Sequence, residues 1–227
     1  MIATMQLADV GVAKAAMLYR QRPRAGKVPG LRQAHFGLAA PFGPGLIRPP
    51  QLGRAGLVAM WEDDAAVDEY FSIHPFARAL EQGWRVRLEP LRMHGSWPGV
   101  PADLPIARML NLEGPFVTLT IARLRPSQAP RFFKTNASAE RGVNDTPGSI
   151  WTSAVALPPF ISSWSLWETE EAIADYAFRT GGGHANAILE QRRKDFHRQS
   201  AFIRFRPYKA EGSLGGRRNP LPAGALP

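Results

Sequence analysis

Apolar and polar residues alternate, or apolar residues cluster, in eight short segments of the chain, and this pattern predicts eight β-strands. The segments are residues 4–12, 33–40, 56–61, 84–93, 116–123, 149–157, 160–167 and 200–208. Helical patterns fill gaps between them, at 13–21, after Trp61, at 127–141, after Trp167 and at 185–197. The helices after the two tryptophans open with acidic residues, which suit the positive end of a helix dipole. Each half of the chain therefore has the order βαββαβ.

The two halves also share a set of residues at identical spacing. Trp61, Glu62, Ala66, Val67 and Tyr70 correspond to Trp167, Glu168, Ala172, Ile173 and Tyr176. A Pro-Gly pair precedes the second strand of each half, at Pro29-Gly30 and Pro147-Gly148, and a histidine follows each later helix, His74 and His184. Such a repeat indicates a duplicated structural unit.

The repeated order is that of the ferredoxin-like unit, an antiparallel four-stranded sheet with both helices on one face. Two copies in one chain can pack their bare sheet faces together. We therefore expect an α+β fold of tandem duplicated ferredoxin-like units with two antiparallel sheets, as in dimeric α/β-barrels. The expected domains are residues 1–95, a Pro- and Gly-containing linker at 96–112, the second repeat at 113–209, and a Gly/Pro/Arg-rich tail at 210–227. Further pairing into a homodimer is compatible with this fold.

The amino-acid composition excludes several kinds of catalytic and metal site. The chain has no cysteine, which excludes disulfides, thiolate catalysis, iron–sulfur clusters and cysteine-ligated haem or zinc, so a metal must be held by histidine or oxygen ligands. Nucleophile elbows, phosphate-binding loops, dinucleotide-binding motifs and zinc-protease motifs are missing from the sequence.

The formal net charge is +9, but no nucleic-acid-binding motif accompanies it, so we expect no nucleic-acid partner. Peripheral contact with an anionic membrane remains compatible with the charge. The sequence shows neither a signal peptide nor an apolar run long enough to span a bilayer, and we expect a cytoplasmic protein.

Among the five histidines, His184 is the best candidate for a metal ligand. It follows three glycines and opens the predicted helix 185–197, where the helix dipole favours the neutral imidazole that a metal requires. The glycines would also let a bulky planar ligand approach the backbone. The alternative is that the glycines form a flexible loop and His184 caps the helix. His74 is interpreted as structural, His35 as a core or pocket residue, and His94 and His197 as surface residues.

The strand 160–167 contains three serines among aromatic residues. Alternation along the strand puts Ser163 and Ser165 on the side of Trp167 and turns Trp164 to the other side. Small hydroxyls beside large rings suit an apolar cavity for a planar cofactor. An edge strand with serines facing water explains the pattern equally well, and Trp151 and Ser153 on the neighbouring strand share this ambiguity.

From residue 130 to 221 the chain resembles the spheroidene monooxygenase family of carotenoid biosynthesis. The matching residues are Phe133, Ala137, Pro147-Gly148, Trp151, Ser165-Leu166-Trp167, Tyr176 to Arg179, His184, Phe202 to Phe205, Glu211-Gly212 and Pro220-Leu221. The resemblance covers most of the second half and, more loosely, the first half. The glycines before His184 and the proline-rich stretch 41–54 depart from the family pattern and put the carotenoid substrate in doubt more than the cofactor.

The resemblance implies a haem-dependent oxygenase that uses oxygen and electrons from reduced ferredoxin to introduce a keto group into an acyclic carotenoid. His184 then corresponds to the axial ligand of haem b. Trp151, Trp164, Trp167 and Ile188 would line the cofactor pocket, and Ser163, Lys134 and Arg179 are candidate hydrogen-bond donors near the distal oxygen. Two alternatives remain open: another haem enzyme of this fold, such as one resembling aldoxime dehydratases, and a non-catalytic carrier of haem or an apolar ligand.

Overall fold

The structure is a computed structural model that describes residues 1–40, 52–107, 109–110, 112–178, 189–190, 193–214, 217–218, 221 and 226. The first half contains β1 (Ile2–Asp9), α1 (Val12–Gln21), β2 (Leu31–Ala40), β3 (Arg54–Trp61), α2 (Asp64–Ile73), α3 (Pro75–Ala79) and β4 (Trp84–Gly95). The second half contains β5 (Phe116–Leu124), the 3-10 helix η1 (Pro126–Gln128), α4 (Ala129–Asn144), β6 (Ser149–Leu157), β7 (Phe160–Trp167), α5 (Glu170–Phe178), β8 (His197–Leu214) and β9 (Arg217–Arg218). Within the described residues, no helix has the length and apolarity to cross a membrane.

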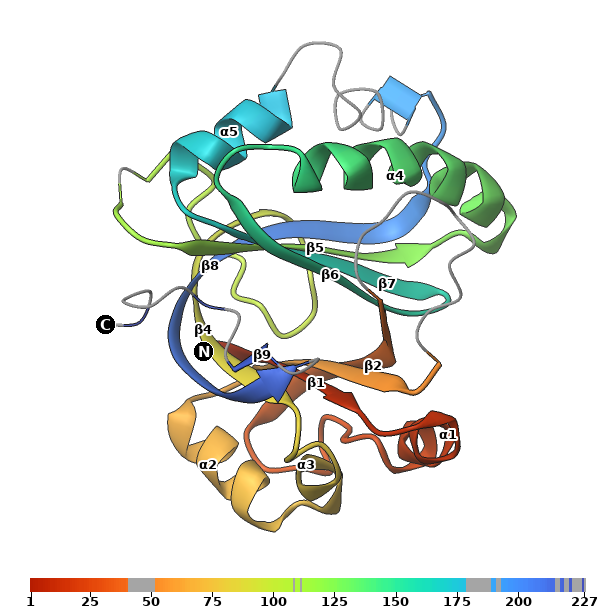
Figure 1. Ribbon diagram of the computed structural model, residues 1–227, viewed down its shortest axis with the longest axis vertical. Coiled ribbons are helices and arrows are strands. Elements are labelled where there is room, and N and C mark those ends of the chain that lie inside the picture. The colour runs from red at the N-terminus through yellow and green to blue at the C-terminus, as the bar shows by residue number, and fades with distance from the viewer. Residues whose placement is uncertain are drawn as a thin grey trace.

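The strands form one antiparallel, barrel-like sheet. The order is β4-β1-β3-β2 in the first half and β8-β5-β7-β6 in the second, so corresponding strands occupy corresponding places. Pairing of β2 with β6 and of β4 with β8 joins the halves and closes the barrel. Helices α1 to α3 cover one side and α4 and α5 the opposite side (Figure 1). The expected α+β class with antiparallel strands is confirmed, but the strands form one sheet and not the two sheets predicted, because β2 pairs with β6 and β4 with β8.

The two Pro-Gly turns have the same geometry. Gly30 and Gly148 have positive φ angles of 65° and 82°. Their carbonyls accept hydrogen bonds from the Glu62 and Glu168 amides, at 2.8 and 2.9 Å. A Cβ atom at either glycine would lie less than 3.0 Å from the Cβ of Ala66 or Ala172. The repeated glycine and alanine are thus explained by close approach of a turn to a helix.

The barrel interior is filled by apolar side chains from both halves. Trp84 and Trp164 are both buried there, and Trp97 of the linker also packs against this core. A cavity beside Trp84 and Trp151 is about the size of one water molecule. Among the described residues, this apolar interior stabilises the fold, and the cavity beside Trp84 and Trp151 has no room for a large ligand.

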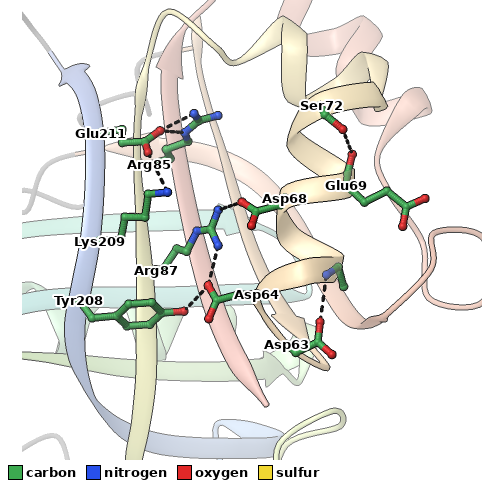
Figure 2. Close-up of polar contacts among 11 residues, drawn as sticks. Asp63, Asp64, Asp68, Glu69, Ser72, Arg85, Arg87, Tyr208, Lys209 and Glu211 are labelled. Atoms are coloured by element: carbon green, nitrogen blue, oxygen red, sulfur yellow. Dashed lines mark hydrogen bonds and ion pairs between the residues drawn. The ribbon is translucent and has the colours of Figure 1, made fainter.

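Polar contacts tie β8 to β4 and α2 across the seam of the barrel (Figure 2). The nearly buried Arg87 of β4 forms ion pairs with Asp64 and Asp68 of α2, and Tyr208 of β8 donates to Asp64 at 2.8 Å. Arg85 of β4 pairs with Glu211 of β8. The hydrogen bond from Arg87 lowers the pKa of the Asp68 carboxyl group.

The last strand is longer than the sequence predicted. β8 begins at His197 and continues to Leu214, whereas the pattern predicted a helix through residue 197 and a strand over 200–208. The prediction for residues 194–197 was wrong, because these residues are not helical and His197 pairs with Leu124 of β5. Pairing partners on both sides of β8 extend the strand beyond its own alternating pattern.

We expect Gly30→Ala to lower the free energy of unfolding by roughly 3 kcal/mol, combining left-handed strain with a steric clash. Urea denaturation measures the loss. Gly26→Ala is the matched control, because Gly26 has a φ of 76° but nothing within 4 Å of the added Cβ. Its expected loss is about 1 kcal/mol. Equal losses in the two variants would show that the contact with Ala66 contributes nothing.

Candidate functional site

The second-half sheet has one face in the barrel and one face toward α4 and α5. Along β7, Trp164 and Leu166 are buried in the barrel core, whereas Trp167 packs with Val143 of α4 and Ile173 of α5. Ser163 and Ser165 alternate with Trp164, so they lie on the helix side with Trp167. The predicted alternation of this strand is confirmed.

The three tryptophans expected to line one pocket lie on two sides of this sheet. Trp167 is on the helix side. Trp164 points into the barrel and stacks on Phe205, with ring centroids 6.5 Å apart. Trp151 is paired with Leu166 and contacts Trp84, at 5.4 Å between centroids, so it also faces the barrel. Of the three, only Trp167 borders the space beneath the helices.

We call the space between the helix-facing side of strands β5 to β8 and helices α4 and α5 the second-half layer. Its sheet side carries a strip of small, mostly hydroxyl side chains. Cross-strand pairs join Thr118 to Ser165 and Thr120 to Ser163, and β6 adds Thr152 beside Ser165. These side chains are only half-buried. The serine-rich pattern of β7 in the sequence corresponds to part of this strip.

The corresponding layer of the first half is packed. The repeat positions of Ser163 and Ser165 are Leu57 and Ala59, both fully buried. At these positions the first half therefore has buried apolar side chains, and the second half has the strip of small, mostly hydroxyl side chains.

Aromatic clusters lie at the two ends of the strip. Trp167 contacts Tyr176 at 5.4 Å between centroids, and Phe132 contacts His197 at 5.4 Å. Phe132 and Val143 mark the corresponding ends of α4, roughly 16 Å apart at 1.5 Å per residue. A flat molecule placed between these ends would meet rings at its edges and hydroxyls on one face.

Two buried polar atoms of the layer have no hydrogen-bond partner in the described part of the chain: Thr118 Oγ1 and His197 Nε2. In the first half the matching hydroxyl of Thr4 accepts from Trp61 Nε1 at 2.9 Å. Trp167 instead donates to Ser165, at 2.8 Å, and leaves Thr118 unpaired. Buried polar atoms normally have partners, so both atoms are open to a ligand or a water molecule.

His197 lies among aromatic rings and is not the surface residue that the sequence suggested. Its imidazole contacts Phe132 and Phe196. Burial lowers its pKa from 6.5 to about 4, so the ring is neutral at pH 7. No feature of the sequence distinguished His197, because its position depends on the start of β8.

A buried ion pair closes the Trp167 end of the layer. Arg204 of β8, the cross-strand neighbour of Thr118, pairs with Glu170 at the start of α5. Glu170 also accepts a hydrogen bond from the Leu110 amide of the linker, at 2.8 Å. This pair corresponds by repeat to Arg87 and Asp64, and it fixes the first turn of α5 on the sheet.

Other predicted site residues are placed as follows. Lys134 is exposed on α4. His184, Arg179 and Ile188 lie outside the described residues. His35 is half-buried on β2 and stacks on Phe160, at 4.3 Å between centroids, as expected for a core or pocket residue. In the described segments, no three histidine or carboxylate side chains gather as a metal site.

No family model matches the chain. The sequence does match those of individual proteins. The chain is 32% identical to a spheroidene monooxygenase from Rubrivivax gelatinosus, over 92% of this chain and 84% of that protein. It is 24% identical to a spheroidene monooxygenase from Rhodobacter capsulatus, over 75% and 73% of the two proteins. The chain belongs to the spheroidene monooxygenase family.

Membership in the spheroidene monooxygenase family confirms the resemblance seen in the sequence and makes the chain a monooxygenase, an oxidoreductase. Solved structures are more distant. An anthrone oxidase-like protein aligns over 97% of this chain and 96% of its own length, with 9% identity and a TM-score of 0.37. A Fusobacterium nucleatum protein aligns over 94% and 95%, with 10% identity and a TM-score of 0.42.

If the second-half layer is thinly filled, a larger side chain should fit there. We expect Ser163→Leu to change the free energy of unfolding by less than about 1 kcal/mol, because it restores the leucine found at the repeat position. Ala59→Leu, in the packed first-half layer, should cost roughly 1–3 kcal/mol. Urea unfolding compares the two. A loss for Ser163→Leu as large as that for Ala59→Leu would contradict a thinly filled layer.

Proposed function

We propose that this member of the spheroidene monooxygenase family is a haem b-dependent monooxygenase that holds haem in the second-half layer, with His184 as the axial ligand. The observation that carries the proposal is the strip of Thr118, Thr120, Ser163 and Ser165, where the first half has packed side chains. The two halves would be copies of one unit, of which the second has become the cofactor-binding half.

The layer suits a large planar group. Part of its sheet side is the strip of small hydroxyl side chains, and in the proposal a ring system would lie against this strip. The aromatic clusters at its ends would exclude water from the edges of such a ring. The Thr118 hydroxyl, which has no hydrogen-bond partner among the described residues, would offer such a group a polar contact.

His184 lies on the segment that joins α5 to β8, and both of these elements border the layer. In the proposal the His184 imidazole would hold the haem iron. When bound, haem supplies the iron at which oxygen is activated with electrons from a donor. An imidazole ligand pushes less electron density than a thiolate does, so hydrogen-bond donors near the oxygen are needed.

Ser163 is the predicted donor that lies in the layer, beside Thr120, and in the proposal its hydroxyl would donate a hydrogen bond within the site. Arg179 keeps its proposed role as a second donor. Lys134 is exposed, so it could act only by turning inward from α4. His197 adds a neutral imidazole at the Phe132 end, where it can orient a polar group of a ligand.

The proposed substrate is an apolar, carotenoid-like small molecule, since the relatives carry the name spheroidene monooxygenase. A reduced ferredoxin or similar protein would supply the electrons. We also propose that the protein is cytoplasmic and forms a homodimer. A need for both oxygen and an electron donor distinguishes it from dehydration of aldoximes, and turnover distinguishes it from a carrier.

The ligand assignment is tested by absorption spectroscopy of the full-length protein reconstituted with hemin. We expect a Soret band in the wild type and a loss of haem affinity of at least about tenfold in His184→Ala, because the axial nitrogen is removed. His94→Ala, at an exposed histidine of β4, should bind haem as the wild type does.

Normal haem affinity in His184→Ala would remove His184 from the site. A wild-type protein that stays colourless with hemin would remove haem altogether. Ser163→Leu tests the location separately: it should lower haem affinity while the chain stays folded, and unchanged affinity would exclude the strip as part of the site.

A further inference from the structure

Helix α1 is attached to the barrel by a narrow strip of its surface. Its buried residues are Ala15 and Leu18, and the remaining residues of the helix are exposed. No acidic residue lies in the first turn, and the Gly11 before the helix provides no side-chain cap. Most of the circumference of α1 is therefore available to a partner.

The exposed side of α1 is mostly apolar. Val12 and Met17 are 59% and 47% exposed. At 100° per residue, they lie on the arc away from Ala15 and Leu18, together with Ala13, Ala16 and Arg20. Tyr19 is 43% exposed but lies beside Ala15, and its ring contacts Phe36 at 6.2 Å between centroids. An exposed helix face of a globular protein normally shows mostly polar residues, whereas Arg20 is the one charged residue on this arc.

A fourth exposed apolar side chain, Leu52, lies beside the start of this helix. Leu52 is 50% exposed. The carbonyl of the next residue, Gly53, accepts hydrogen bonds from the amides of Val10 and Gly11 at 2.8 and 3.0 Å. The backbone thus holds Leu52 near Val12, and the apolar area extends past the helix.

Basic residues surround this apolar area, and acidic residues are missing from it. Between residues 12 and 32 the basic residues are Lys14, Arg20, Arg22, Arg24, Lys27 and Arg32, and there is no Asp or Glu. The preceding acidic residue, Asp9, forms an ion pair with Arg54 at 2.7 Å, and the next in the sequence is Glu62. Arg22 also lies over the ring of Tyr19, at 4.2 Å. The local charge is strongly positive.

We infer that the α1 surface, formed by residues 12–27 and Leu52, docks on an anionic lipid bilayer. Val12, Met17 and Leu52 would enter the boundary between headgroups and acyl chains, and the arginines and lysines would contact lipid phosphates. A short helix that presents apolar residues outward between basic ones has the composition of an interfacial helix. The inference does not depend on haem or on His184.

The location of α1 agrees with this role. Figure 1 shows α1 at the outer edge of the first-half helices, on the opposite side of the barrel from α4 and α5. Docking through α1 would therefore leave the second-half layer uncovered. The charge and the apolar residues lie on the same element, so one surface satisfies both requirements of binding to an anionic membrane.

Flotation of the full-length protein with lipid vesicles tests the inference. We expect binding to vesicles of phosphatidylcholine with roughly 30% phosphatidylglycerol to exceed binding to phosphatidylcholine alone by about tenfold. Raising the salt from about 0.1 to 0.5 M should weaken it severalfold, because the charges are screened. Wild-type protein that ignores phosphatidylglycerol, or binds it equally at high salt, would overturn the inference.

Two double variants of α1, each with a double-variant control, test whether α1 is the membrane-binding surface. Val12→Ser with Met17→Ser, and Arg20→Gln with Arg24→Gln, should each lower binding at least about fivefold. The controls are Ile73→Ser with Ile106→Ser, and Arg193→Gln with Arg198→Gln, at exposed sites elsewhere, which should keep full binding. Circular dichroism checks that all variants are folded.

Equal losses in the control variants would overturn the assignment to α1. Two other results would replace the lipid by a different occupant. Dimerisation without lipid that Met17→Ser abolishes would assign the surface to a second copy of the chain. If no α1 variant changed vesicle binding, the lipid would bind elsewhere on the protein. The α1 surface would then be assigned to a protein partner.

Discussion

Pairing of β4 with β8 is the constraint on which the remaining architecture depends. A four-stranded ferredoxin-like sheet has one face without helices, and two such sheets can bury these faces only if they stay together. The ladder between β4 and β8 runs from Trp84–Gly212 to Gly95–Ala201, and the pairing of β2 with β6 closes the other side. Closure also removes free edges that could pair with other chains.

Once the barrel is closed, its interior is shared by both halves and must be apolar. Ligand binding would then take place in one of the two outer layers, each between the sheet and the helices of one half. The first layer is packed around Leu57, Trp61 and Tyr70, with Tyr70 donating to Gln6 at 3.2 Å. The equivalent positions of the second half carry Ser163, Ser165 and Trp167, so the two halves of similar topology differ in the polarity of their outer layers.

The sequence predicted the parts of this fold that are local. The strands and most helices follow from periodicity, and Trp61 with Trp167 revealed the repeat because each occupies the same place at the end of a third strand. The turn glycines 30 and 148 could be matched for the same reason. A barrel was expected, but the strand pairs that close it could not be predicted, since β4 and β8 are far apart in the chain.

The candidate site was predicted in part. Alternation along β7 separated Ser163 from Trp164 correctly, but it could not tell that Trp151 and Trp164 face the barrel while Trp167 faces the helices. That distinction depends on which face of the sheet is enclosed. His197 was misread because the pattern placed it at the end of a helix, whereas it begins β8 and contacts Phe132, distant in sequence.

The unpaired atoms of the second-half layer have an energetic meaning. A buried polar group without a partner costs about 1–3 kcal/mol, and Thr118 Oγ1 and His197 Nε2 are two such groups. The first half avoids the cost at Thr4 through a bond to Trp61. A ligand that supplies partners in the layer recovers this free energy on binding, so part of its affinity comes from groups that destabilise the free protein. Replacing them by apolar residues would stabilise the chain and weaken the ligand together, because both effects arise from the same two atoms.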